Sequence, residues 1–394
     1  MNLSQRAQSC GYSPMRKFHP FAVKAQQQGK TIYHLNIGQP DIQTPPAYLD
    51  TLHNYNADVL AYAEAPGRPV LLKAVQDYYR KLGITLDTSD ILITFGGSEA
   101  LDILMRCILD PGDEVLVAEP FYPNYATFIR SAGGEIVPIP TKAEENYRHA
   151  TYENYESRIT SRTRAILITN PGNPTGNVLT QEELQILADV AKKHDLYLIA
   201  DEVYREFVYD GKMALVGHLQ GMEENIVMID SVSKRFSACG ARVGALISKN
   251  KALIAQALKF CQGRLAVATI DQELAAALYG VDASYFEAVR EEYRHRRDVC
   301  CACLRKIPGV LCAEPAGAFY LMAKLPVDDT DRFQQWLLEE FEDNGETVMF
   351  APGAGFYATE NGGTQEVRIA YVLQEQKLRR AIELLGLAIE QYNR

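Results

Sequence analysis

The 394-residue sequence lacks the usual marks of a membrane, nucleic-acid-binding or secreted protein. It contains no run of 18 or more apolar residues, so we expect no transmembrane helix. Lys and Arg number 40 against 50 Asp and Glu, a formal net charge of −10, and no Lys/Arg-rich block occurs. This balance argues against a nucleic-acid partner, which usually requires a basic face. The polar N-terminus lacks the apolar core of a signal peptide, so we expect a cytoplasmic protein.

The composition is that of an ordinary globular protein, with 47% hydrophobic and 23% charged residues. No internal repeat or low-complexity tract interrupts it. A chain of this length predicts roughly two domains. Among the eight cysteines, Cys300, Cys301 and Cys303 lie close together, which raises the possibility of a metal site. A helix is predicted there, and neighbouring residues of a helix point to different sides, so we expect reduced structural thiols instead.

Alternating strand and helix patterns predict a large α/β domain. Short apolar runs predict buried strands at residues 91–95, 115–118, 135–140, 165–169, 196–200, 226–230 and 243–247. Helical patterns lie between several of them, most clearly at 100–109 and 181–194, the second opening with Thr180 and Glu183 as a capping box. We therefore predict a mostly parallel seven-stranded sheet flanked by helices, in a domain formed by residues 45–285.

The pattern changes after about residue 285 and predicts a smaller α+β domain. A long charged helix at 285–306 comes first, and further helices are predicted at 330–344 and 374–392. Strand-like runs occur at 319–324, 347–350 and 366–371. The first 44 residues have no obvious place in the parallel sheet, so we assign residues 1–44 and 286–394 together to this second domain.

Ligands of open parallel sheets bind beyond the carboxyl ends of the strands, so the residues that follow each predicted strand are candidates. Gly96, Gly97 and Ser98 open a helix, where backbone N–H groups favour a phosphate, although an ordinary strand-to-helix turn has the same pattern. Tyr122, between two prolines, offers a ring for a flat cofactor or simply packs as a core aromatic. Asn173 lies in a dense turn, where its amide either satisfies the turn or donates to a ligand.

The strands predicted at 196–200 and 226–230 are followed by ionisable residues. Asp201 is costly to bury unless it is paired, and a protonated pyridine nitrogen is one suitable partner; the alternative is a helix N-cap. Tyr204 lies three residues further on. Lys234 has two cations near it in sequence, Arg235 and Arg242, which would lower its pKa and favour an amine nucleophile. A lone lysine is more often a solvated surface residue.

The order of these motifs resembles the fold-type I pyridoxal-phosphate enzymes, specifically the class I aminotransferases of the bacterial aspartate aminotransferase-like kind. The motifs are Gly-Gly-Ser at 96–98, Tyr122, Asn-Pro-Thr-Gly at 173–176, Asp-x-x-Tyr at 201–204, Ser-x-Ser-Lys at 231–234 with Arg242, and Val-Arg-Ile-Ala at 367–370. The resemblance implies that Lys234 forms the Schiff base with pyridoxal 5′-phosphate and moves the proton at the substrate α-carbon. It implies that Asp201 pairs with the ring nitrogen and keeps the ring an electron sink.

The same resemblance implies roles for the other positions. Asn173 and Tyr204 would hydrogen-bond the phenolic oxygen of the cofactor, and Tyr122 would stack on its ring. Its phosphate would be held by Gly97, Ser98, Ser231 and Arg242. Arg368 would grip the substrate α-carboxylate, assisted by Asn173 and Gly38. Tyr62 matches a tyrosine that reaches the phosphate of a neighbouring subunit, which implies a homodimer.

The sequence does not fix the substrate. Gln39 stands where many relatives have Glu, and Arg16, Arg68 and Arg264 are all candidates for reading a side-chain carboxylate. Aspartate is our first expectation for the donor, with a 2-oxo acid such as 2-oxoglutarate as acceptor. Aromatic or other donors and a C–S β-lyase on the same fold remain open. Ser231-x-x-Lys234 also matches the serine penicillin-binding enzymes, but no Lys-Thr-Gly follows it.

Overall fold

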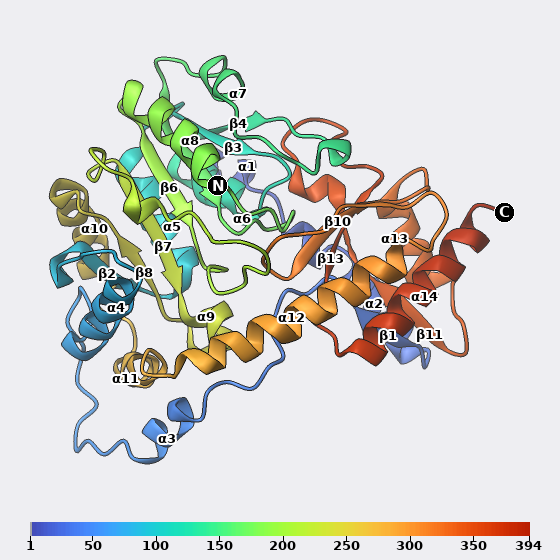
Figure 1. Cartoon of the computed structure of the whole chain (residues 1–394), viewed down its shortest axis with the longest axis horizontal. Helices are drawn as coiled ribbons and strands as arrows, with labels where there is room; N and C mark the ends of the chain where they lie inside the picture. The colour runs from blue at the N-terminus through green and yellow to red at the C-terminus, as the bar shows by residue number, and fades with distance from the viewer. Residues whose placement is uncertain (1) are drawn as a thin grey trace.

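The computed structural model describes residues 2–394, and its largest sheet has seven strands (Figure 1). These are β2 (Ile91–Thr94), β3 (Glu114–Ala118), β4 (Glu135–Ile139), β5 (Thr163–Thr169), β6 (Tyr197–Asp201), β7 (Ile226–Ser231) and β8 (Gly244–Ile247). Their order is β2-β8-β7-β6-β5-β3-β4, and β8 alone among them runs antiparallel to the other six. All seven predicted strands are confirmed, each within two residues of its expected ends.

Apolar cores on both faces of this sheet explain its continuous hydrophobic runs. Along β6, Leu198 and Ala200 belong to one core cluster, whereas Ile199 belongs to the other. The first face is covered by α4 (Pro69–Lys81), α8 (Gln181–Lys193) and α11 (Thr269–Leu278), and the second by α5 (Gly96–Ile108), α6 (Asn124–Ala132) and α10 (Lys251–Gly263). A strand that is buried on both faces cannot alternate with polar residues.

The predicted helix starts differ in accuracy. The capping box of α8 is confirmed, because Thr180 Oγ1 accepts from Glu183 N at 3.1 Å and Glu183 Oε2 accepts from Thr180 N at 2.9 Å. The helix predicted from residue 100 begins earlier, at Gly96. Glu99 reaches back to accept a hydrogen bond from Phe95 N at 2.7 Å, and this contact stabilises the extra turn.

A second, antiparallel sheet lies beside the first and has the order β12-β13-β10-β9. Its strands are β9 (Leu311–Cys312), β10 (Tyr320–Lys324), β12 (Ala351–Pro352) and β13 (Glu366–Ala370). It packs with α12 (Ala283–Leu304), α13 (Thr330–Glu339) and α14 (Glu375–Tyr392) around a core of its own. The expectation that a helix extends from residue 330 to residue 344 is wrong, because α13 ends at Glu339 and the chain further on turns with positive φ at Asn344 and Gly345, which an α-helix excludes.

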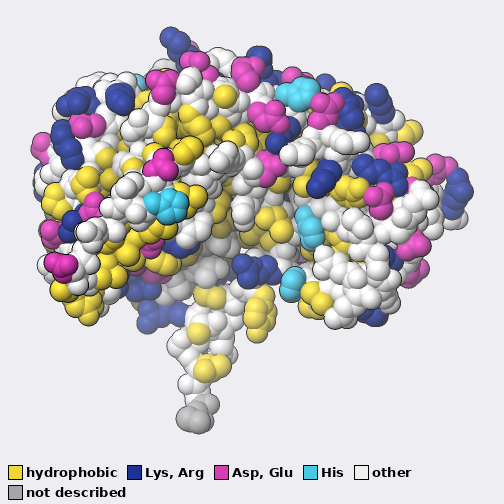
Figure 2. All heavy atoms as spheres, turned by 90° about the horizontal axis from the view of Figure 1, so that it is seen from below, with side chains coloured by type: hydrophobic (Ala, Val, Ile, Leu, Met, Phe, Trp, Pro, Cys, Tyr) yellow, Lys and Arg dark blue, Asp and Glu magenta, His cyan; other side chains and the backbone are white. Residues whose placement is uncertain are grey.

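The N-terminal region joins the second half of the chain, since β1 (Thr31–His34) pairs in parallel with β11 (Glu346–Met349). It also contributes α1 (Gln5–Ser9), α2 (His19–Gln27) and α3 (Ala47–His53), while α7 (Tyr152–Glu156) and α9 (Val232–Arg235) complete the helices of the described residues. The residues nearest the N-terminus project from the body as a narrow arm (Figure 2). The division into domains at 45 and 285 stays a prediction.

Two features expected from the sequence can be placed on this fold. Cys300, Cys301 and Cys303 lie on α12, as the helix prediction required, and within residues 2–394 no set of His, Cys, Asp or Glu side chains is arranged to hold a metal ion. No helix of that same part of the chain is both long and apolar enough to cross a membrane.

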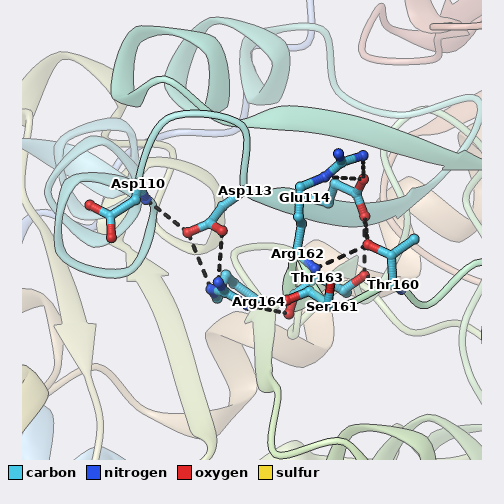
Figure 3. Close-up of polar contacts among 8 residues, drawn as sticks. All are labelled: Asp110, Asp113, Glu114, Thr160, Ser161, Arg162, Thr163 and Arg164. Carbon is cyan, nitrogen blue, oxygen red and sulfur yellow. Dashed lines mark hydrogen bonds and ion pairs between the residues drawn. The ribbon is translucent and has the colours of Figure 1, made fainter.

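Charged side chains gather at the amino ends of β3 and β5, away from the strand ends where ligands are expected (Figure 3). Glu114 accepts hydrogen bonds from Thr160 Oγ1 at 2.5 Å and from Arg162 Nη2 at 2.6 Å. Asp113 pairs with Arg164 at 2.9 Å. Burial of the Glu114 carboxylate raises its pKa, but the hydrogen bonds from these donors have the larger combined effect, so the pKa of Glu114 is lowered. The cluster ties the segment before β5 to the start of β3.

Candidate active site

A cavity of about 680 Å³ lies at the carboxyl ends of the parallel strands, between the first sheet, the second sheet and the N-terminal region. Its lining includes most of the residues predicted to form the site: Gly38, Gly97, Ser98, Tyr122, Asn173, Asp201, Tyr204, Ser231, Lys234, Arg242 and Arg368. Tyr62 does not line it and is 84% exposed. The fold thus brings together residues that are up to 330 positions apart, from Gly38 to Arg368.

Asp201 ends β6 and is buried, with 7% of its surface exposed. Tyr125, from α6, donates to Asp201 Oδ2 at 2.7 Å, and the backbone of Val203 donates to Oδ1 at 3.4 Å. Burial raises the pKa of Asp201 to about 6, and the hydrogen bond from Tyr125 lowers it by less. Both donors are neutral, so this desolvated carboxylate is suited to hold a cation.

Lys234 belongs to α9, which begins directly after β7. Ser231 caps this short helix by accepting from Ser233 N at 3.1 Å. The Lys234 amine donates to Gly38 O at 2.9 Å and lies 3.8 Å from Cys239 Sγ. Arg235 does not accompany it as the sequence suggested: this side chain is buried in the core, where it pairs with Asp230 and lies over the ring of Tyr78.

Arg242 and the start of α5 form a cradle for an anion. Arg242 has φ +54 and donates to Cys239 O at 3.0 Å, which directs its guanidinium over Gly96. A Cβ at Gly96 would lie 2.5 Å from Arg242 Nη2, so glycine is needed for this close approach. Gly97, Ser98 and Ser231 line the cavity beside it. A helix N-terminus next to a forked cation is a suitable phosphate site.

Arg368, on β13, brings a buried cation from the second sheet, with 1% of its surface exposed. Its guanidinium donates to Asn173 Oδ1 at 3.2 Å and to Asn36 O at 2.6 Å, and it lies 4.5 Å from the ring centre of Tyr320. Its buried Nε has no hydrogen-bond partner among the described residues. A buried guanidinium with spare donor capacity is suited to bind a carboxylate.

The aromatic residues of the cavity are held by one another and by neighbouring amides. Tyr122 packs edge-on against Tyr125, and its hydroxyl accepts from Asn124 Nδ2 at 2.7 Å. Burial raises the pKa of Tyr122 to about 12, so its ring stays neutral. Tyr204 and Tyr320 are joined through their hydroxyls at 3.0 Å, and Tyr320 also donates to Gly38 O at 3.4 Å.

Three residues of this site were not assigned a role from the sequence. Tyr125 lies three positions after Tyr122 in the same motif, and helical spacing after a strand end is a signal that indicates it. Tyr320 and Cys239 gave no such signal. Of the three candidate arginines, Arg16 lines the cavity, whereas Arg68 and Arg264 do not.

Comparison with known proteins agrees with this geometry. The sequence model of the family described as aminotransferase class I and II matches residues 30–385. The aspartate/prephenate aminotransferase of Thermus thermophilus is 33% identical over 97% of each chain, and the arginine–pyruvate transaminase of Pseudomonas aeruginosa is 31% identical over 94% of this chain and 93% of its own. A solved structure of the Thermus thermophilus aspartate aminotransferase with maleate superposes with a TM-score of 0.90 at 30% identity, covering 98% of this chain and all of the other.

Proposed function

The chain belongs to the aminotransferase class I and II family and is an aminotransferase, and from that premise we propose that it moves the amino group of L-aspartate to a 2-oxo acid with pyridoxal phosphate held in the cavity. The alignment of the family covers the cavity-lining residues from His34 to Arg368. Relatives of similar identity are named for different amino donors, so identity alone does not choose the donor.

The residues of the cavity fit pyridoxal phosphate. The anion cradle at Gly96 and Arg242 is suited to its phosphate, and the buried carboxylate of Asp201 to its protonated ring nitrogen. The Lys234 amine, which lines the same cavity, is suited to its aldehyde. When bound, the cofactor supplies a carbonyl that takes the substrate amine and a ring that withdraws electrons from the α-carbon.

Each side chain then has a defined task. Arg368 orients the substrate by its α-carboxylate, with Asn173 as the neighbouring amide. The Nζ of Lys234 takes the proton from the substrate α-carbon and would deliver it to the cofactor carbon that had carried the aldehyde. Asp201 keeps the ring nitrogen protonated, and Tyr125 holds that carboxylate in place. With the cofactor bound, Tyr122 would cover one face of its ring, and Tyr204 would donate a hydrogen bond to its phenolic oxygen.

The observation that carries this proposal is that one cavity is lined by a primary amine, a buried carboxylate and a buried arginine, namely Lys234, Asp201 and Arg368. Borohydride treatment of the cofactor-loaded protein, followed by peptide mass mapping, tests it. We expect the cofactor to be fixed to Lys234, and Lys234→Ala to remain unlabelled and inactive. Lys212→Ala, at an exposed lysine, serves as the control and should match the wild type. Labelling at another lysine would refute the assignment.

The proposal includes a homodimer with shared sites. In α3 and the segment that follows it, the chain exposes the apolar side chains Leu49, Leu52, Val59, Leu60 and Tyr62. This part of the chain lies at the outer edge of the molecule (Figure 1). Mixing Lys234→Ala with Tyr62→Ala protein tests it. In a mixed dimer, one site receives both native residues, so activity should return on subunit exchange. Two inactive or impaired variants that never complement each other would contradict sharing of Tyr62.

A further inference from the structure

Arg235 and Asp230 form a buried ion pair directly behind the wall of the cavity. Their side chains are 1% and 0% exposed, and neither residue belongs to the cavity lining, although Lys234 does. Consecutive residues of a helix point to different sides, so Lys234 faces the cavity whereas Arg235 faces the core. There the guanidinium of Arg235 lies 4.4 Å from the ring centre of Tyr78, on α4.

This pair connects the two ends of the segment that carries Lys234. Asp230 is the last residue but one of β7, and Arg235 is the last residue of α9. Asp230 Oδ1 also accepts a hydrogen bond from Ser231 N at 2.7 Å. A helix of a single turn is not stable by itself, so the position of α9 depends on contacts of this kind. The pair therefore keeps the charges of Asp230 and Arg235 at a fixed place behind the Lys234 amine.

The carboxylate of Asp230 cancels a charge that would otherwise act on Lys234. An arginine does not lose its proton in a protein, so Arg235 alone would be a permanent buried cation. Within residues 2–394, Asp230 is the one carboxylate that pairs with Arg235, and the Nε and Nη1 atoms of Arg235 have no hydrogen-bond partner. A cation without a counter-charge, one residue away from Lys234, would disfavour a positive charge on that amine.

The other ionisable groups around Lys234 lie on two sides of it. The charged side chains of the cavity lining are, besides Lys234 itself, Arg16, Asp201, Arg242 and Arg368. The remaining titratable groups of the lining are His19, His34, Cys239 and four tyrosines. Behind the wall, Glu202 pairs with Arg205 at 2.6 Å, and Tyr78 donates to Glu206. All of these groups stay in place when only Asp230 or Arg235 is changed.

We propose that Asp230 is a positioning residue that acts on the reactive amine from behind the cavity wall: by neutralising Arg235, it allows Lys234 and its linkage to the cofactor to carry a positive charge. The inference rests on the proposed function, in which Lys234 forms that linkage. The sequence alone suggests a cationic effect of Arg235 on Lys234, and the ion pair with Asp230 is the physical reason why this effect is cancelled.

The test removes one charge, the other charge, or both. In cofactor-loaded Asp230→Asn, the protonated form of the cofactor linkage, which absorbs at the longer wavelength, should be lost at a pH about one unit lower than in the wild type. Arg235→Met should raise this pH midpoint, because Asp230 keeps its hydrogen bond from Ser231 N and remains an anion. The double variant carries neither charge, so its midpoint should return to the wild-type value.

A second readout needs no cofactor. Acetic anhydride acetylates neutral amines, and the exposed Lys212 serves as an internal reference. In cofactor-free Asp230→Asn at neutral pH, we expect acetylation of Lys234 relative to Lys212 to be about tenfold faster, the factor that corresponds to one pH unit. The double variant should again match the wild type. Peptide mass mapping measures both rates.

Asp113→Asn is the matched control. It also removes a buried carboxylate from a pair with an arginine, Arg164 at 2.9 Å, but at the start of β3 and away from the cavity. It should leave both the spectral midpoint and the acetylation rate of Lys234 unchanged, even where it lowers the stability of the protein.

The outcomes separate this inference from the proposed function. Midpoints that move in the same direction in Asp230→Asn and Arg235→Met, or a double variant that keeps the Asp230→Asn value, would overturn it and make the pair a structural contact of α9. If Asp230→Asn does not fold, Arg235→Met decides, and an unchanged or lower midpoint there overturns the inference. If the wild type develops no cofactor band, the proposed function fails, and the acetylation rates still decide the role of Asp230.

Discussion

Tyr125 donates a hydrogen bond of 2.7 Å to Asp201, and this pair lies buried at the end of β6. Burial raises the pKa of the Asp201 carboxyl to about 6, whereas the hydrogen bond acts in the opposite direction and is too weak to cancel it. At neutral pH the cavity therefore holds a desolvated carboxylate whose hydrogen-bond donors are neutral. Such a group costs stability until a cation joins it, and under the proposed function that cation is the ring nitrogen of the cofactor.

The cofactor-free protein should be stabilised by Asp201→Asn at neutral pH. Because the folded pKa is about 6 and the usual value is 3.8, the folded state retains a proton that the unfolded state loses between these pH values. Stability of the wild type therefore falls as pH rises through this window, by about 3 kcal/mol at most. We expect the variant to be more stable by up to this amount at pH 7.5 and no more stable near pH 4, measured by urea unfolding.

The matched control for this prediction is Asp189→Asn, an exposed aspartate on α8, which should show no such pH dependence. In the cofactor-loaded enzyme, Asp201→Asn should lower kcat by about 10²- to 10³-fold, the usual effect of removing a group that stabilises charge in the transition state. A variant that is less stable than the wild type by the same amount at every pH would contradict the account of Asp201.

Arg368→Lys should weaken the binding of every amino-acid and oxo-acid substrate to a similar extent. Lysine cannot reproduce the forked contacts to Asn173 and Asn36 while it also binds a carboxylate. We expect kcat/KM to fall by about 10²-fold or more for all donors and acceptors, with cofactor affinity unchanged. Steady-state kinetics with aspartate and alanine measure this, beside Arg379→Lys on the exposed face of α14. A loss confined to dicarboxylates would point to Arg368 as the side-chain reader instead.

Gly96→Ala should impair cofactor binding more than catalysis. Gly96 has φ +77, and a Cβ would lie 2.5 Å from Arg242 Nη2, so the guanidinium must move. Gly112 is a suitable control, since it has φ +87 but nothing within 4 Å of a Cβ. Both alanines cost about 1–2 kcal/mol of backbone strain at positive φ, and Gly96→Ala should in addition lower affinity for pyridoxal phosphate by about tenfold or more. Equal cofactor affinities in the two variants, measured by fluorescence titration, would argue against the cradle.

Glu114→Gln should reduce stability at neutral pH and leave activity unchanged. The folded-state pKa of Glu114 is depressed below its usual 4.5 by Thr160 and Arg162, against the effect of burial. A carboxyl group whose pKa is lower in the folded than in the unfolded state stabilises the folded protein at pH values above the unfolded pKa. This stabilisation disappears as the pH falls through the folded-state pKa. We expect a loss of about 1–3 kcal/mol at pH 7 that shrinks toward pH 3. A change in kcat would contradict the separation of this cluster from the cavity.

The sequence predicted the sheet well because strands buried on both faces leave an unmistakable pattern, as the alternating contacts of Leu198 and Ile199 illustrate. It predicted most of the residues that follow the strands and line the cavity, because the carboxyl ends of such strands meet at one edge of the sheet. It could not predict that α13 ends at Glu339, because the residues from there to the turn at Asn344 and Gly345 continue a pattern that still looks helical. Nor could it predict Tyr320, since that contact depends on how the second sheet packs against the first.

The three arginines Arg16, Arg68 and Arg264 also show that local sequence does not predict tertiary contacts. The three arginines look alike in local sequence and differ only in their tertiary contacts. Arg68 pairs with Glu273 and Arg264 with Glu99, each more than 160 residues away in sequence. An ion pair over such separations leaves no periodic pattern. The structure therefore adds what local residue types cannot supply, namely which charges are already paired.

The most direct measurement of the central claim is the visible absorption spectrum of the cofactor-loaded protein while L-aspartate is added without any oxo acid. We expect the long-wavelength band of the bound cofactor to disappear and one oxaloacetate to form per site. We also expect 2-oxoglutarate then to restore the band. A protein that develops no such band with added pyridoxal phosphate, or whose band yields no oxo acid with aspartate or any other L-amino acid, would contradict the proposed function.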